Sequence, residues 1–66
     1  MLEQTKIAEL LLDRNLLAVS KRTSISYASI HRLVNDPERR VRLSTLQILS
    51  DYLTQQADDI LRYANG

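Results

Sequence analysis

The chain has 66 residues, with no cysteine and a single histidine, so it is long enough for one domain but cannot rely on disulfides or a metal for stability. Apolar runs such as Leu10-Leu11-Leu12 are much shorter than the roughly 18 residues of a membrane span, and the acid-bearing N-terminus is unlike a secretory signal. We expect a single domain over residues 1–66, cytoplasmic, with no membrane association, metal or cofactor.

Charge is distributed unevenly along the chain, although the formal net charge is only +1. Residues 14–42 carry seven basic and two acidic side chains, a net charge of +5, whereas residues 1–13 and 43–66 each carry −2. A basic centre of this kind is typical of a surface that attracts phosphates and steers association with a polyanion. Charge alone also fits an ordinary solvated surface, and the two interpretations stay open at this point.

Apolar residues recur at helical spacing and no segment alternates with the period of a strand, so the sequence predicts an all-α fold. The first helix should run from residue 2 or 3 to residue 13, with Ile7, Leu10 and Leu11 at positions i, i+3 and i+4 of an inward face. A second helix should span residues 16–23. Asn15 should begin it, because its side-chain carbonyl can accept an N–H of the first turn.

Ser24-Ile25-Ser26 predicts a turn, and Ser26 is expected to cap a third helix over about residues 27–35. Asn35-Asp36-Pro37 should end that helix, because proline disfavours the α conformation of the residue before it and has no N–H of its own. The polar loop of residues 38–42 then leads to Ser44, the expected cap of a fourth helix. A break at residues 54–56 should separate this helix from a fifth. The apolar side of the fourth helix should consist of Leu43, Leu46, Ile48, Leu49, Tyr52 and Leu53. That of the fifth helix should consist of Ala57, Ile60, Leu61 and Tyr63.

Residues 15–35 have the layout of a helix-turn-helix unit, in which two short helices are joined by a turn of about three residues. Val19, Ile25, Ile30 and Leu33 are expected where the helices and the turn pack together. Helical geometry then places a polar set of side chains on the opposite, exposed side of the third helix. Its members are Tyr27, Ala28, His31, Arg32 and Asn35.

The stretch from Ser20 to Asn35 resembles the helix-turn-helix core of the Cro/C1-type family, the DNA-binding domain of phage repressors and many small bacterial regulators. Residues 43–49 are similar to the family's next helix, and residues 58–63 to the closing helix of its small members. The resemblance implies a compact five-helix, lambda-repressor-like domain whose helix at residues 26–35 reads the major groove. Ser24 departs from the family, which usually has glycine there, so its backbone should either tolerate a Cβ or be strained in a left-handed conformation.

The resemblance also implies which side chains contact DNA. Arg32 would direct two donors at guanine and Ala28 would touch a thymine methyl, while Tyr27, His31 and Asn35 would contact bases beside them. Phosphate contacts, which set register and affinity, are implied for Lys21, Arg22, Ser26, Ser29, Arg39, Arg40 and Arg42. The alternatives are that Tyr27 only covers the helix surface, that His31 only faces solvent, and that the loop arginines are merely solvated.

The predicted function is a sequence-specific regulator of transcription, a repressor, that binds a double-stranded DNA operator. We expect a homodimer, formed in solution or only on DNA, with residues 52–63 as its contact surface. The alternative is that the apolar side chains of this segment only close the core of a monomer. The alternative is a protein-interaction module of the same fold, of the anti-repressor or antitoxin kind, which should display an apolar patch on the third helix. An enzyme with a small-molecule substrate is not expected. The sequence has no Gly-rich phosphate loop or activated nucleophile, and Asp58 and Asp59 would point about 100° apart on a helix.

Overall fold

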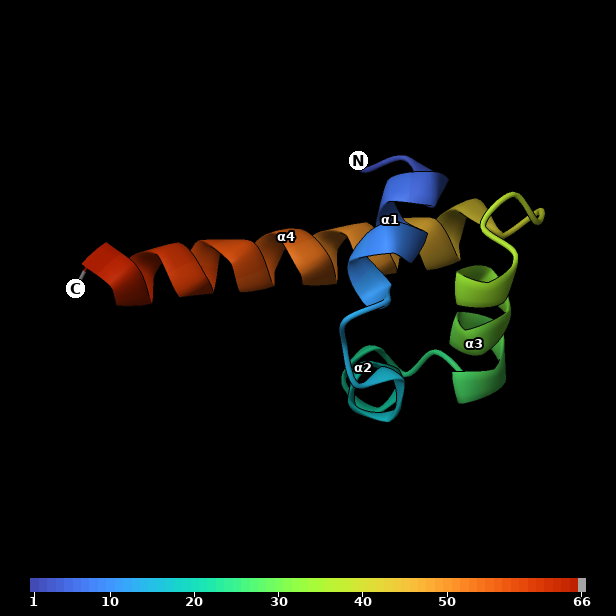
Figure 1. Ribbon diagram of the computed structural model, residues 1–66, viewed down its shortest axis with the longest axis horizontal. Helices are drawn as coiled ribbons and strands as arrows, with labels where there is room; N and C mark the ends of the chain where they lie inside the picture. Colours follow the sequence, from blue (N-terminus) through green and yellow to red (C-terminus); the bar gives the residue numbers. More distant parts are fainter. Residues whose placement is uncertain (66) are drawn as a thin grey trace.

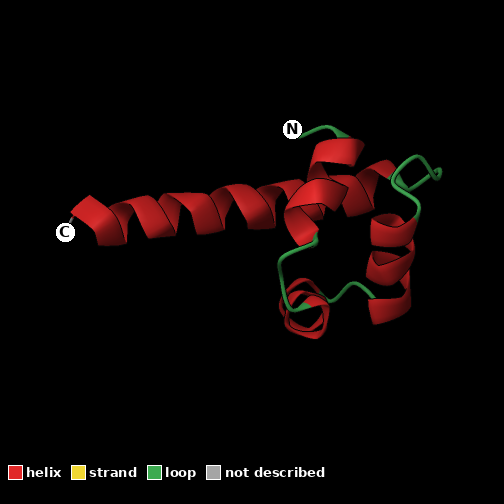
Figure 2. Ribbon diagram, in the orientation of Figure 1, coloured by secondary structure: helices red, strands yellow, loops and turns green. Residues whose placement is uncertain are grey.

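The computed structural model describes the backbone of residues 1–65 and the side chains of residues 1–56. The described backbone contains four helices and no strand, which confirms the predicted all-α fold (Figures 1 and 2). The helices are α1 (Gln4–Leu11), α2 (Leu16–Thr23), α3 (Tyr27–Asn35) and α4 (Leu43–Asn65). The first three and the beginning of α4 form one body, whereas the rest of α4 runs away from it (Figure 1), and the molecule measures 39 × 21 × 20 Å.

The prediction of five helices is wrong for the described backbone, because residues 43–65 form one continuous helix. The expected break at residues 54–56 contains neither glycine nor proline, so nothing interrupts the backbone hydrogen bonds there. The apolar residues assigned to a fifth helix, Ala57, Ile60, Leu61 and Tyr63, have side chains outside the described residues. Helix α1 is also shorter at both ends than the sequence predicted.

The core lies where α1, α2 and α3 pack against the first turns of α4. Its buried side chains are Ile7, Ala8, Leu11, Val19, Ile30, Leu33, Leu46, Leu49 and Leu53. The predicted inward positions on the helix-turn-helix unit are confirmed, with Ile25 packed at the edge of the cluster.

Two residues predicted for the inner side of α4 are exposed instead, Leu43 by 59% and Ile48 by 45%. Successive helical residues point about 100° apart, so Ile48 cannot share the buried stripe of Leu49. Leu43 is the first residue of α4, and helical side chains point back toward the N-terminus, so its side chain lies beyond the packed turns.

Side-chain caps begin two of the helices as predicted. Asn15 Oδ1 accepts from the backbone N–H groups of Leu17 and Ala18, at 3.1 and 3.2 Å, and Ser26 Oγ accepts from the N–H of Ser29 at 3.2 Å. The predicted cap at Ser44 is wrong. Helix α4 begins at Leu43, so Ser44 is its second residue, and the carbonyl of Arg42 accepts the first helical hydrogen bond, from Leu46 N–H at 3.2 Å.

The turn between α2 and α3 contains the left-handed residue that the sequence raised as one of two alternatives. Ser24 has φ 62° and ψ 17°, a conformation that disfavours a Cβ by roughly 1–2 kcal/mol. Three contacts hold the turn: Ser20 Oγ donates to the carbonyl of Ile25 at 2.6 Å, Ser24 N–H donates to the carbonyl of Ser20 at 2.9 Å, and Thr23 Oγ1 accepts from Ile25 N–H at 3.3 Å. The turn thereby fixes how α3 is oriented on α2.

Candidate nucleic-acid interface

One side of α3 is buried and the other side carries a row of exposed side chains. Ile30 and Leu33 are 0% and 1% exposed and anchor α3 on the core. The exposed side chains, called the α3 row below, are the five that the sequence singled out: Tyr27, Ala28, His31, Arg32 and Asn35. Apart from Tyr27, which is 47% exposed, the α3 row has no large apolar side chain.

Contacts between successive turns of α3 order part of this row. The rings of Tyr27 and His31 stack with their centroids 5.7 Å apart and their planes at 23°. The side-chain nitrogen of Asn35 lies 3.0 Å from Nδ1 of His31. These residues are spaced four apart, so each contacts the next along one face of the helix. The ring of His31 is therefore held from both sides, which reduces the conformational entropy lost when it meets a ligand.

The start of α3 has two serines that were predicted to contact phosphates, the cap Ser26 and, in the first turn, Ser29. Ser26 Oγ and Ser29 Oγ are 2.7 Å apart, and the first also accepts from the backbone of the second. The N–H groups of Tyr27 and Ala28 belong to the part of the helix that has no intrahelical acceptor. This end of α3 therefore offers hydroxyls and backbone donors where the helix dipole favours an anion.

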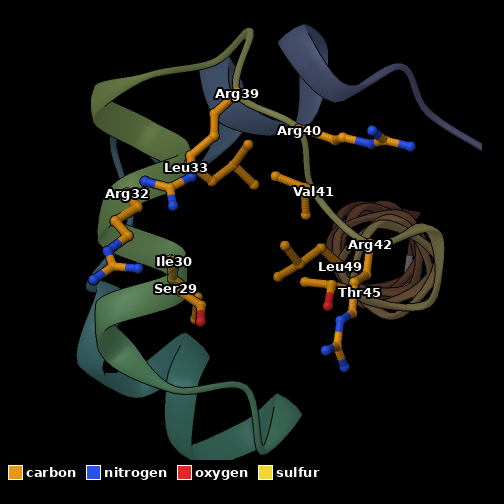
Figure 3. A pocket seen from close by; sticks show the side chains of 10 residues that line it. All are labelled: Ser29, Ile30, Arg32, Leu33, Arg39, Arg40, Val41, Arg42, Thr45 and Leu49. Atoms are coloured by element: carbon orange, nitrogen blue, oxygen red, sulfur yellow. The ribbon is translucent and has the colours of Figure 1, made fainter.

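A cleft of about 360 Å³ lies between α3, the loop after it and the start of α4 (Figure 3). Its floor is apolar, formed by Ile30, Leu33, Val41 and Leu49. Its polar lining comes from three segments of the chain: Ser29 and Arg32, then Arg39, Arg40 and Arg42, and finally Thr45. We call this site the arginine cleft.

The arginines of the cleft extend in different directions. Arg39 reaches from the loop back toward α3, beside Arg32 and Leu33, whereas Arg42 runs alongside Thr45 at the start of α4 (Figure 3). Arg40 points away from α3. The cleft therefore has the guanidinium groups of Arg32 and Arg39 on the α3 side, that of Arg42 on the α4 side and that of Arg40 at its outer edge.

These positive charges have no carboxylate partner among the described side chains. The salt bridge found there joins Lys6 and Glu9 on α1, at 3.9 Å, and involves none of the cleft residues. Four uncompensated guanidinium groups in one concave site create a positive potential that attracts phosphate oxygens.

The structure does not bring all the predicted phosphate contacts together. Lys21 and Arg22 are exposed in the last turn of α2 and do not line the arginine cleft. Thr45, conversely, lines the cleft although the sequence did not single it out. One feature of the sequence could have indicated Thr45: its hydroxyl lies in the first turn of the helix that follows a basic loop. The start of a helix has free N–H groups, so a hydroxyl there is well placed to help bind an anion.

Other kinds of site lack support in the described residues. No group of three or more metal-ligating side chains occurs there. Among the same residues, every buried side-chain nitrogen or oxygen has a hydrogen-bond partner. None of the described helices is long and apolar enough to cross a membrane.

Helices α2 and α3, their tight turn and the exposed polar side of α3 define a helix-turn-helix domain. A sequence profile of the Cro/C1-type HTH DNA-binding domain matches residues 6–65. The chain therefore belongs to this family, which confirms the resemblance drawn from the sequence and supports a role in DNA binding. Comparison with curated proteins and with solved structures gave no significant match.

Proposed function

We propose that the protein is a sequence-specific transcriptional regulator, acting as a repressor, that inserts α3 into the major groove of double-stranded DNA. The observation that carries this proposal is the position of the α3 row directly beside the arginine cleft. Base edges would be contacted by Tyr27, Ala28, His31, Arg32 and Asn35. Phosphates would be contacted by Lys21, Arg22, Ser26, Ser29, Arg39, Arg40 and Arg42.

The division of roles follows from chemistry and position. Arg32 stands on α3 and can direct two parallel donors at the O6 and N7 atoms of guanine. Arg39 and Arg42 lie on the two sides of the arginine cleft, where they can bind a phosphate strand beside the groove that α3 occupies. The interaction-module alternative requires an apolar α3 surface, and the polar α3 row favours DNA over it.

Binding should depend steeply on salt. If each chain displaces counterions from about 4–6 phosphates, the logarithm of affinity should fall linearly against the logarithm of salt concentration, with a slope near −0.9 per phosphate. Selection from random duplexes, followed by titration of the preferred duplex at several salt concentrations, tests both sequence preference and phosphate contact. A salt slope near zero would contradict the assignment of the phosphate contacts. The absence of any preferred duplex would contradict the recognition of bases by α3.

We also propose a homodimer on an inverted repeat with half-sites about one helical turn apart, because one α3 spans too few base pairs to select a site in a genome. The distal part of α4 supports this proposal, since its backbone leaves the body (Figure 1) and isolated helical segments of this length are marginal in water. Tyr52 packs partly on the core, and the other apolar residues expected at this surface lie outside the described side chains. Analytical ultracentrifugation with and without a palindromic duplex measures the stoichiometry. Saturation at one chain per duplex, without cooperativity, would contradict the dimer.

A further inference from the structure

The loop between α3 and α4 is tied to α1 by one side chain. The Nε2 group of Gln4 donates to the carbonyl of Pro37 at 3.0 Å and also to the carbonyl of Arg39. The two acceptors are 33 and 35 residues away in sequence. Both hydrogens of one carboxamide are therefore used to hold two carbonyls of the same loop.

Besides the packing of Val41 on the core, few other hydrogen bonds hold the backbone of this loop. Within it, the N–H of Arg39 donates to the carbonyl of Asp36 at 3.0 Å, which closes a single turn. Proline at position 37 contributes no donor. Among the described residues, the hydrogen bonds that reach the loop from a distant part of the chain are the two from Gln4.

Gln4 itself is held in place by the packing of α1 on the core. Gln4 is the first residue of α1, and that helix is fixed to the core by Ile7 and Leu11, both 0% exposed. The segment before it is held to α4, because Leu2 N–H donates to the buried hydroxyl of Ser50 at 2.8 Å. Gln4 therefore holds the loop in a fixed position relative to the core.

We propose that Gln4 is a positioning residue of the DNA interface, which holds the loop so that Arg39 reaches toward α3 beside Arg32 and Arg40 stands at the outer edge of the arginine cleft. This inference rests on the proposed phosphate contacts of these arginines. Without the two hydrogen bonds, the loop would populate other conformations in which one or two of its arginines no longer reach the phosphate strand, so those contacts would be lost. Gln4 itself lies outside the lining of the cleft and is not expected to touch DNA.

The first test measures the loop without DNA. Gln4→Met keeps the length of the side chain and its helical preference but has no donor. Gln55→Met, on the exposed side of α4, is the matched control. Limited trypsin digestion of the native protein should cut after Arg39 and Arg40 about fivefold faster in Gln4→Met than in the control, since the loss of a net hydrogen bond changes an opening equilibrium by about that factor.

Cleavage after Lys21 and Arg22 in α2 is the internal reference. General destabilisation would accelerate the cuts in α2 and in the loop alike, whereas release of the loop accelerates only the loop cuts. Equal acceleration of both sets, or loop cutting at the rate of the control, would overturn the positioning role.

The second test measures DNA binding of the same variants. With Gln4→Met, the salt slope should become shallower by about 1–2, as expected when one or two phosphate contacts are lost, while the preference among single-base variants of the duplex stays unchanged. A salt slope equal to that of Gln55→Met would overturn the inference even if the loop is cut faster. Failure of the unmodified protein to bind any duplex would instead overturn the proposed function, and the digestion result would show whether Gln4 still holds the loop.

Discussion

The α3 row and the arginine cleft adjoin at Arg32 but depend on contacts of different range. In the α3 row, Tyr27, His31 and Asn35 contact one another through four-residue spacing within a single helix. The cleft, by contrast, is assembled from α3, the loop and the start of α4, and its loop is held from α1. The geometry of one helix is enough to order the α3 row, whereas the arginine cleft forms only when the tertiary structure is complete. Substitutions should therefore affect the two regions in separable ways.

The largest effect is expected for a buried residue that packs beneath both regions. Ile30 is fully buried behind the α3 row and also forms part of the floor of the arginine cleft. Ile30→Ala should lower the free energy of unfolding by about 2–5 kcal/mol, because a cavity remains in the core. Urea denaturation gives the value. Ile48→Ala, at an exposed isoleucine, is the control and should stay within about 0.5 kcal/mol of the unmodified protein. Similar losses in the two variants would contradict the assignment of Ile30 to the core.

The next effect distinguishes base contacts from phosphate contacts. Arg32→Ala should weaken binding to the preferred duplex by about 1–3 kcal/mol and relax the preference at one or two base pairs, because a pair of donors to one base is lost. Binding to a set of single-base variants measures this change. If affinity falls equally for every sequence, Arg32 contacts only the phosphate strand beside the cleft.

Arg40→Ala should produce the complementary change. Its loss should weaken all sequences by a similar factor and make the salt slope shallower by about 1, because a phosphate contact carries no sequence information. Salt titrations on the preferred duplex and on a random one give both quantities. A change confined to one base pair would assign Arg40 to the reading surface instead.

The smallest effect concerns the turn, which lies outside both regions. Ser24→Gly should stabilise the protein by about 1 kcal/mol, since glycine adopts the left-handed conformation without the Cβ conflict. The melting temperature should rise by about 4–8 °C for a domain of this size. Ser44→Gly, in the first turn of α4, should lower it, and DNA affinity should stay unchanged in Ser24→Gly. A melting temperature that does not rise in Ser24→Gly would mean that Ser24 carries no strain.

The sequence by itself determined the helix-turn-helix unit and the α3 row. The caps at Asn15 and Ser26, the turn and the inward positions of Ile30 and Leu33 all follow from contacts within a few residues. Because helical periodicity converts spacing directly into direction, the exposed side of α3 could be read without knowing what covers its other side.

Only the tertiary structure decided how the rest is arranged. The continuity of α4, the exposure of Leu43 and Ile48, the entry of Thr45 into the cleft and the contact of Gln4 with the loop were not predicted. Periodicity gives the angle of a side chain on its helix but not which part of that helix a neighbour covers. Hydrogen bonds between residues more than 30 positions apart leave no pattern in a single sequence, so the support of the loop became visible only in the folded chain.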